Sequence, residues 1–244
     1  MRKMAKLLEV QGVTKRFSGL TAVDDLSFYL EEGEVLGLMG PNGSGKTTIF
    51  NVIMGEYLPD SGRIFFEGKD ITDYPVYQRV KLGIARTYQV PRPFTEVPII
   101  EDIRIGTIPD SIVGSLRGGA RPEEVMKIAE DVGLGERFSM YPHELTMGDL
   151  RRLELAKALA TNPRIVLLDE IFAGLTVAEI EEIDKLLRRK REVEGLDFIV
   201  VSHDLKALAP LVDRVLVINF GQRIAEGSFE KIVDDKKVKA AYFG

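Results

Sequence analysis

Gly40-Pro41-Asn42-Gly43-Ser44-Gly45-Lys46-Thr47-Thr48 carries the clearest structural signal in this chain of 244 residues. The stretch satisfies the pattern G-x-x-x-x-G-K-[ST] at every required position. An apolar run, Glu34–Met39, precedes it and predicts a buried strand, while helix-like apolar spacing follows from Lys46 onward. A glycine-rich loop between a strand and a helix presents backbone N–H groups that bind phosphate. The stretch therefore predicts a nucleotide site on an α/β fold.

Each residue type in this loop has an expected task. The glycines let backbone N–H groups turn toward the phosphates, and the helix N-terminus adds about half a positive charge. Lys46 should reach the β and γ phosphates, and the Thr47 hydroxyl should bind magnesium. A glycine-rich turn that binds nothing is the opposing interpretation, and the full match in its strand–helix context disfavours it. The expected phosphate-binding residues are Gly40, Asn42, Gly43, Ser44, Gly45, Lys46, Thr47 and Thr48.

A second apolar run, Arg164–Glu170, ends in two acidic residues. A parallel central strand delivers such side chains to the edge of a nucleotide site. Asp169 could bind the magnesium ion with its carboxylate, either directly or through a water ligand. Glu170 points to the opposite side of the strand end and could polarise the attacking water as a general base. The alternative is that both acids only cap the following turn.

A third apolar run, Asp197–Val201, leads to His203, one of two histidines in the chain. A lone histidine is usually structural. At the carboxyl end of a strand in an open α/β sheet, however, it lies where such sheets bind ligands, and its nitrogens could bridge the γ phosphate to Glu170 or to a partner loop. The other histidine, His143, follows a proline near the start of a helix and is expected to be a surface or capping residue.

The order and spacing of these motifs resemble those of the ATP-binding subunits of ABC transporters over nearly the whole chain. The resemblance implies that Gly40–Thr47 is the Walker A motif, that Ile165–Glu170 is Walker B with its catalytic glutamate, and that His203 is the H-loop histidine. It implies that Gln89 is the Q-loop residue, whose amide binds magnesium or the attacking water, and that Phe17 stacks on adenine. Ala173–Thr176 stands where the family has its D-loop. ATP and Mg²⁺ are the implied ligands.

The signature segment departs from the family pattern Leu-Ser-Gly-Gly-Gln, because Leu145-Thr146-Met147-Gly148-Asp149 stands there. Thr146 keeps a hydroxyl and Gly148 keeps a close backbone approach, so both are expected to contact a γ phosphate. Met147 is bulky where the usual residue is small. An Asp149 carboxylate would repel a triphosphate, although the same charge is favourable at a helix N-terminus.

Three segments resemble the ATPases of branched-chain amino acid importers in particular. The segments are Lys15–Asp25, Gly83–Phe94 and Val238–Gly244. ATPases of urea import or lipopolysaccharide export share many of these features and remain alternatives. The family implies a single ATPase domain over 1–244, transmembrane permease subunits as partners, and a second ATPase subunit that closes head-to-tail, in a homodimer or a heterodimer.

The amino-acid composition limits the other classes of protein to which this chain could belong. A chain with 45% hydrophobic residues can bury the core of one large α/β domain. No apolar run reaches the roughly 18 residues that span a bilayer, so a role on the cytoplasmic side of the cell membrane would require docking and not insertion. A net charge of -5 gives no support for a nucleic-acid partner. The absence of cysteine excludes disulfide and thiol chemistry and fits a reducing compartment.

The expected fold is α/β: a P-loop NTPase (RecA-like) parallel sheet with an antiparallel β layer and a helical signature subdomain. Strands of that layer are predicted over Leu7–Thr14, Thr21–Leu30 and Gly62–Glu67. The stretch 90–161 is predicted to be a helical insert, with helices near Pro98–Gly106, Pro122–Gly133 and Gly148–Ala160.

Three other function classes share part of this pattern. A soluble ABC ATPase without a transporter would keep every catalytic residue, but such proteins more often carry fused domains or coiled-coil inserts. A GTPase is disfavoured because no Asn-Lys-x-Asp motif occurs. A poorly hydrolysing regulatory subunit is compatible with the altered signature but disfavoured by Lys46, Asp169, Glu170 and His203.

Overall fold

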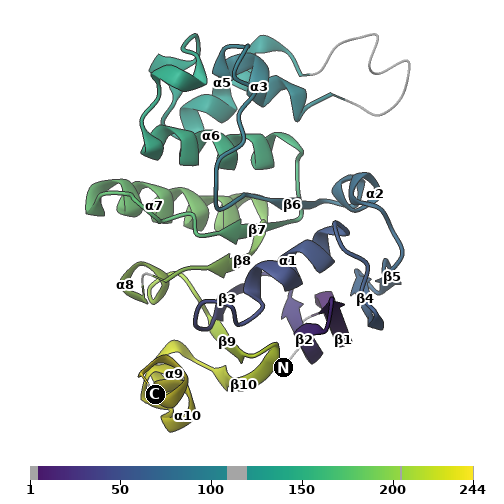
Figure 1. Cartoon of the computed structure of the whole chain (residues 1–244). Coiled ribbons are helices and arrows are strands. Elements are labelled where there is room, and N and C mark those ends of the chain that lie inside the picture. The colour runs from purple at the N-terminus through teal and green to yellow at the C-terminus, as the bar shows by residue number, and fades with distance from the viewer. Residues whose placement is uncertain (1–4, 109–119, 204, 244) are drawn as a thin grey trace.

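The structure, a computed structural model, describes residues 5–108, 120–203 and 205–243 (Figure 1). The described strands are β1 (Lys6–Phe17), β2 (Leu20–Glu31), β3 (Val35–Met39), β4 (Ser61–Phe66), β5 (Lys69–Asp70), β6 (Ile84–Arg86), β7 (Ile165–Asp169), β8 (Asp197–Val201), β9 (Arg214–Asn219) and β10 (Gln222–Gly227). The described helices are α1 (Lys46–Met54), α2 (Val76–Lys81), α3 (Ile99–Ile105), α5 (Pro122–Asp131), α6 (Met147–Ala160), α7 (Val177–Glu194), α8 (Leu205–Leu208), α9 (Phe229–Asp234) and α10 (Lys236–Phe243), with 3-10 turns η1 (Gly135–Arg137) and η2 (Pro142–Glu144).

The central sheet has the order β10-β9-β3-β8-β7-β6, with β9, β3, β8, β7 and β6 parallel to one another. Every residue of β3, β7 and β8 is buried. Burial on both faces explains why these strands read as continuous apolar runs in the sequence. Their carboxyl ends meet at one edge of the sheet, where parallel sheets bind ligands.

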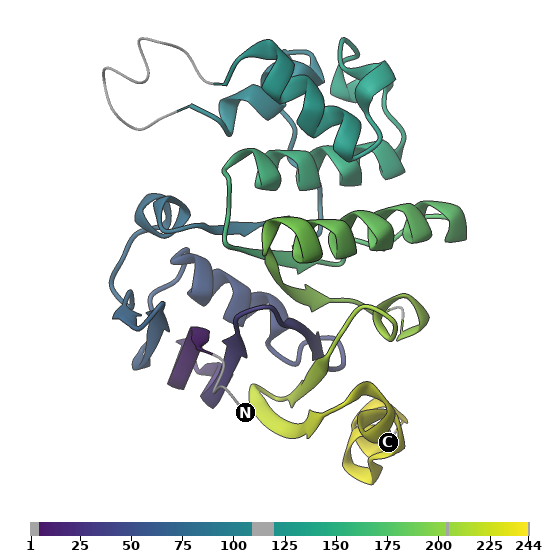
Figure 2. The same cartoon turned by 180° about the vertical axis from the view of Figure 1, so that it is seen from behind.

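The two faces of this sheet belong to two separate cores. Alternate residues such as Leu36 and Leu167 face α1 and the antiparallel sheet, whereas their neighbours Val35 and Val166 face the core that α5, α6 and α7 share. The period of two along each strand accounts for this division. Figure 2 shows α1 and α7 on opposite sides of the central strands.

The predicted antiparallel layer is present as a sheet of order β2-β1-β4-β5. β1 and β2 cover the predicted ranges and extend beyond them, whereas β4 ends at Phe66, one residue before the predicted end, because Glu67 lies in a turn with a φ of 50°. β1 ends with Phe17 at the carboxyl edge of the central sheet, where this residue lines the same pocket as the α1 N-terminus. The fold class predicted from the sequence is therefore confirmed.

The helices α3, α5 and α6 contact one another and lie at the end of the molecule opposite α9 and α10 (Figure 1). They coincide with the three helices predicted between residues 98 and 160. Within the described part of the chain, no helix is both long enough and apolar enough to cross a membrane.

Candidate functional site

The turn between β3 and α1 requires glycine at two positions. A Cβ on Gly40 would lie 2.2 Å from the Ile218 carbonyl oxygen and 2.5 Å from Ser44 Oγ. A Cβ on Gly45 would lie 2.4 Å from the Ala22 carbonyl oxygen, and Gly45 also has a φ of 107°. Only glycine fits such contacts and the positive φ without strain. The loop therefore packs tightly against the backbone of β9 on one side and of β2 on the other.

The N-terminus of α1 is open toward solvent and carries no compensating negative charge. Its N-cap residue, Gly45, makes no side-chain cap hydrogen bond, and the first turn contains no acidic residue. The unpaired N–H groups and the helix dipole therefore favour an anion at this point. Ser44 Oγ is buried without a hydrogen-bond partner among the described residues, which leaves it available to a phosphate oxygen.

A pocket of about 450 Å³ opens at this helix N-terminus. Its volume falls in the range of small-molecule sites, about 300–1,000 Å³. It brings together most of the predicted site residues from both sheets and from the loops at their edge. The lining residues are Phe17, Leu20, Thr21, Ala22, Asn42, Gly43, Ser44, Gly45, Lys46, Thr47, Thr48, Gln89, Asp169, Glu170, Val201, His203 and Phe220.

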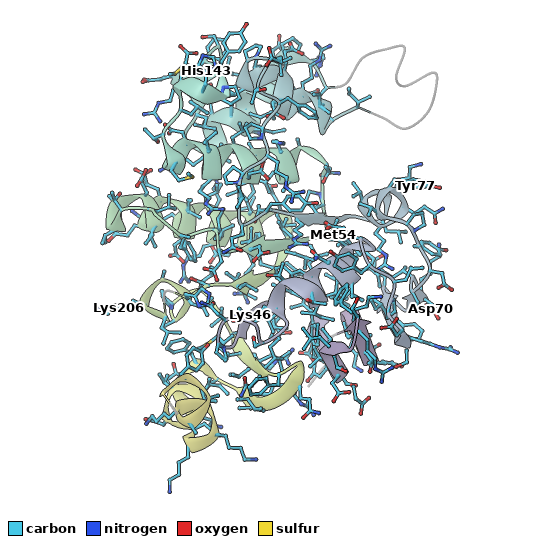
Figure 3. The ribbon with its side chains drawn as sticks, viewed as in Figure 1. Lys46, Met54, Asp70, Tyr77, His143 and Lys206 are labelled. Carbon is cyan, nitrogen blue, oxygen red and sulfur yellow. The ribbon has the colours of Figure 1, made fainter. Side chains whose placement is uncertain are left out.

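Lys46 is the buried cation of the pocket. Its Nζ donates to the carbonyl oxygens of Gly40 at 2.7 Å and Pro41 at 3.0 Å. Burial lowers the pKa of Lys46, and the nearby carboxylates of Glu170 and Asp169 act in the opposite direction. Gly40 itself does not line the pocket but anchors this ammonium. Figure 3 shows Lys46 near the middle of the molecule, where α1 begins.

Glu170 lies immediately after β7 in a backbone conformation that is unusual for a residue with a side chain. Its φ is 54°, and its N–H donates to the Val201 carbonyl oxygen at 2.9 Å. The backbone N–H of His203 donates to Glu170 Oε2 at 3.2 Å. Oε1 is buried without a hydrogen-bond partner among the described residues, so it can accept a hydrogen bond from water in the pocket.

Burial raises the pKa of Glu170, and the charge and the backbone N–H of His203 act against this rise. A carboxylate with a raised pKa is a better proton acceptor near neutral pH than an ordinary glutamate. His203 Nε2 lies 3.2 Å from Glu170 Oε1, and the histidine side chain is 47% exposed toward the pocket mouth. The predicted pairing of these two residues at the strand ends is present.

Asp169 is held from the neighbouring strand by a residue that the sequence analysis did not single out. Arg86 Nη2 donates to Asp169 Oδ2 at 2.7 Å, and both side chains are almost fully buried. The Asp169 N–H donates to Thr87 Oγ1 at 3.1 Å. The sequence shows only that an arginine ends the short apolar run Ile84–Arg86. It does not show that this arginine pairs with Asp169, because the pairing depends on the register of β6 and β7.

Oxygen donors for a magnesium ion converge on the pocket from the first turn of α1, from the loop after β6 and from the end of β7. Thr47, Gln89 and Asp169 all line it, and magnesium prefers such oxygen ligands, supplemented by phosphate and water. Within the described residues, no group of three or more His, Cys, Asp or Glu side chains could hold a metal ion by itself. The residues present fit magnesium that arrives with a nucleotide phosphate.

Phe17 stands at the pocket mouth on an aromatic support. Its ring packs edge-to-face against Tyr57 with centroids 5.1 Å apart, and Lys15 Nζ lies 5.4 Å from its centroid. The side of Phe17 that faces the pocket is open, since 37% of the residue is exposed. Phe220, which is 83% exposed and has a φ of 47°, lines the same pocket and was missed by the sequence analysis.

The predicted signature residues Thr146 and Gly148 do not line this pocket. Thr146 is the N-cap of α6: its Oγ1 accepts the Asp149 N–H at 3.2 Å, and Asp149 Oδ2 accepts the Thr146 N–H at 3.2 Å. Asp149 also pairs with Arg137. A Cβ on Gly148 would lie 2.4 Å from Glu179 Oε1, so α6 packs closely against the start of α7 at this point. The buried Asp149 therefore has the structural role of a helix N-terminal acid.

Gln89 is exposed and lines a second hollow beside the first, which also contains Glu170 and His203. Gln89 therefore lies between the nucleotide pocket and the helical region that follows it in the chain. His143 is exposed in η2, where its ring stacks near Tyr141 at 5.8 Å. Figure 3 shows His143 far from Lys46, which agrees with the predicted surface role.

Comparisons with known proteins agree with this geometry. The family model that describes ABC transporters matches residues 23–173. The chain is 35% identical to the high-affinity branched-chain amino acid transport ATP-binding protein LivG of Salmonella typhimurium, over 98% of each chain. It is 33% identical to the lipopolysaccharide export system ATP-binding protein LptB of Acidithiobacillus ferridurans, over 99% of this chain and 98% of the relative.

Among solved structures, a nucleotide-free ATP-binding cassette from an ABC transporter superposes with a TM-score of 0.88. That structure is 32% identical and covers 98% of this chain and 99% of its own. The phosphate loop, the paired acids after β7 and the histidine after β8 lie at one pocket of this shared fold. The chain belongs to the ABC transporter family and is an ATP-binding, ATP-hydrolysing subunit of such a transporter.

Proposed function

We propose that this ATPase subunit powers the import of branched-chain amino acids. Two ATPase subunits would close head-to-tail while docked on transmembrane permease subunits at the cytoplasmic face of the membrane. ATP would shift the population toward the closed pair, because it binds that state better than the open state. Closure would drive the permease, and hydrolysis through Glu170 would reset it.

The observation that carries the head-to-tail arrangement is the incomplete nucleotide pocket of a single chain. The pocket contains Lys46, Glu170 and His203, but Thr146 and Gly148 lie elsewhere on the same chain. Thr146 and Met147 are exposed at the start of α6, with Met147 55% exposed. A second subunit turned head-to-tail would bring its own Thr146 and Gly148 to this open pocket.

Each site residue has a proposed role. Lys46 and the N–H groups at the start of α1 bind the β and γ phosphates. Glu170 accepts the proton of the attacking water, since its Oε1 accepts no hydrogen bond from the described residues and burial raises its pKa. His203 holds the Glu170 carboxylate in place.

The other pocket residues contact the magnesium ion, the attacking water and the adenine ring. Thr47, Gln89 and Asp169 would hold Mg²⁺, which supplies positive charge to the phosphate oxygens when bound. Gln89 also orients the attacking water. Phe17 stacks on adenine.

We further propose that 1–244 is one ATPase domain and that 90–161 is a helical subdomain inserted in it. The segment after Gln89 would form the lip of a groove for a short helix of a transmembrane subunit. Val90 and Phe94 are 71% and 53% exposed there, which suits apolar contact with a partner. A hollow of about 540 Å³ adjoins this region, lined by Thr95, Glu96, Tyr141, His143 and Glu144.

Hydrolysis and assembly can be tested on the purified chain and on Glu170→Gln with saturating ATP and magnesium. The parent should hydrolyse ATP, and Glu170→Gln should lose about 100- to 10,000-fold in rate while still binding ATP. Light scattering should find an ATP-dependent dimer of the variant. Tight ATP binding with neither hydrolysis nor a dimer would instead indicate an obligate, different ATPase partner or a regulatory subunit.

Cargo needs a separate experiment, because LivG and LptB are similarly distant from this chain. Deletion of the gene in its source organism should abolish uptake of labelled leucine, isoleucine and valine. The parent gene should restore uptake, and the gene carrying Glu170→Gln should not. Unchanged uptake of these amino acids would refute this cargo. A loss of urea uptake or of surface lipopolysaccharide would then identify the alternative.

A further inference from the structure

A buried arginine links the strand that precedes Gln89 to the carboxylate proposed for magnesium. β6 pairs with β7 in parallel, and the register places Arg86 opposite Leu167. Side chains two residues apart share one face of a strand, so Asp169 lies on the same face as Leu167, one step toward the pocket. The register therefore delivers the Arg86 guanidinium to Asp169 and to no other residue of Walker B.

The contact is specific to one oxygen of the carboxylate. Arg86 Nη2 donates to Asp169 Oδ2 at 2.7 Å, with the two side chains 3% and 2% exposed. A charge-assisted bond of this length, made away from solvent, is among the strong hydrogen bonds of proteins. With Oδ2 bound to Arg86, Oδ1 is the oxygen of Asp169 that is left for a metal or for its water ligands.

The guanidinium is itself fixed by its surroundings on several sides. Nη1 donates to Asn51 Oδ1 on α1 and lies 3.5 Å from Glu56 Oε1. The rings of Phe50 and Tyr88 lie 5.6 Å and 5.0 Å from its central carbon. These contacts tie Arg86 to α1, the helix whose N-terminus faces the phosphate site. A flexible lysine ammonium cannot reproduce the planar fork that bonds Asn51 and Asp169 at once.

We infer that Arg86 is a positioning residue for magnesium. It fixes the Asp169 carboxylate so that one oxygen faces the metal, and it ties that carboxylate to the helix that binds the phosphates. This inference rests on the proposed role of Asp169 toward Mg²⁺. Partners of metal ligands in the surrounding shell typically change metal affinity by about 10- to 100-fold when mutated. Arg86→Lys should have an effect of that size.

The experiment measures ADP binding by calorimetry across a magnesium chloride series, because ADP is not hydrolysed. Arg86→Lys should raise the magnesium concentration at half-saturation about 10- to 100-fold and leave magnesium-free ADP affinity within about threefold of the parent. In an Asp169→Asn background, Arg86→Lys should produce no further shift beyond about twofold, since the two residues act as one unit. Asn51→Ala removes the acceptor of Arg86 Nη1 and should also raise the magnesium concentration at half-saturation. This variant replaces Arg86→Lys in the test if Arg86→Lys does not fold.

Arg79→Lys is the matched control. Arg79 is fully buried against the other end of α1, where Nη1 donates to the carbonyl oxygens of Val52 and Ile53 at 2.7 and 2.8 Å. Its replacement should lower thermal stability but leave the magnesium midpoint unchanged.

Three outcomes would overturn the inference: a parental midpoint in Arg86→Lys, an equal loss of ADP affinity with and without magnesium, or a full Arg86→Lys shift that persists beside Asp169→Asn. A failure of the proposed function looks different, because ADP binding by the parent would then not depend on magnesium or on Asp169.

Discussion

His203 approaches both oxygens of the Glu170 carboxylate: its backbone N–H donates to Oε2 at 3.2 Å, and its Nε2 lies 3.2 Å from Oε1. The first contact fixes the orientation of the carboxylate, and the second places a titratable ring beside the oxygen that has no hydrogen-bond partner among the described residues. A general base acts in its deprotonated form, so the rate of hydrolysis should fall as the pH drops through the pKa of Glu170. The neighbouring histidine therefore influences the acid limb of the pH–rate profile.

His203→Ala should lower ATP hydrolysis and move that acid limb to higher pH. The substitution removes a charge that opposes the burial-driven rise of the Glu170 pKa, so this pKa should rise further. The loss should be smaller than the roughly 100- to 10,000-fold loss expected when the base itself is removed. Steady-state hydrolysis across a pH series measures both effects. His143→Ala is the control, since His143 lies far from Lys46 (Figure 3); an unmoved acid limb in His203→Ala would contradict the prediction.

The parts of the site that the sequence predicts are those coded by local patterns. Lys46 follows from a motif of eight positions between a strand and a helix, and Glu170 and His203 follow from apolar runs that end in polar residues. Parallel strands run in the same direction, so their carboxyl ends lie together at one edge of the sheet. No long-range contact has to be known for this step.

The parts that the sequence does not predict depend on register and on distant contacts. Arg86 and Asp169 are 83 residues apart, and their pairing depends on which residue of β6 faces which residue of β7. Phe220 reaches the pocket because the adjacent Gly221 N–H donates to the Ser44 carbonyl oxygen at 2.9 Å. Neither contact leaves a periodic or motif signal in the chain.

Asp149→Gln, which moves the signature toward the family pattern, should destabilise the protein. Asp149 is buried, accepts the Thr146 N–H in the capping box and pairs with Arg137. The loss of a buried charge-assisted bond costs about 1.5–3 kcal/mol. Urea unfolding midpoints measure the change, and Met147→Ala, at a residue 55% exposed, should stay within about 0.5 kcal/mol. Unchanged stability with faster hydrolysis would show instead that the Asp149 carboxylate repels the nucleotide.

Phe17→Ala should weaken ADP binding without changing the affinity for inorganic triphosphate. Stacking of a base on an aromatic side chain is worth about 1–3 kcal/mol, or about 5- to 150-fold in affinity. The triphosphate lacks a base, so its binding reports on the phosphate loop alone. Phe138→Ala is a matched control, because Phe138 and Phe17 are both 37% exposed and Phe138 does not line the pocket. Equal weakening of both ligands would mean that Phe17 supports the loop and does not stack on adenine.

Asp197→Asn should stabilise the protein at neutral and alkaline pH. Asp197 is 1% exposed, and its Oδ1 accepts the Gly33 N–H at 2.7 Å. Burial raises the pKa of Asp197 from 3.8 to about 6. Between these two values the folded state binds more protons than the unfolded state, so the contribution of Asp197 to stability falls as the pH rises and is constant above about pH 6.

A shift of this size corresponds to a penalty of about 3 kcal/mol for the ionised form. An asparagine keeps an oxygen for the Gly33 N–H and carries no charge, so the variant should gain little near pH 4 and up to that amount near pH 8. Thermal unfolding midpoints of parent and variant at these two pH values measure the difference. Asp213→Asn is the control: Asp213 also accepts a backbone N–H, from Val35 at 2.8 Å, but it is 45% exposed and pairs with Arg191. Asp213→Asn should not raise the unfolding midpoint at either pH. An increase for Asp197→Asn that is equal at both pH values would refute the link between its stability effect and the ionisation of Asp197.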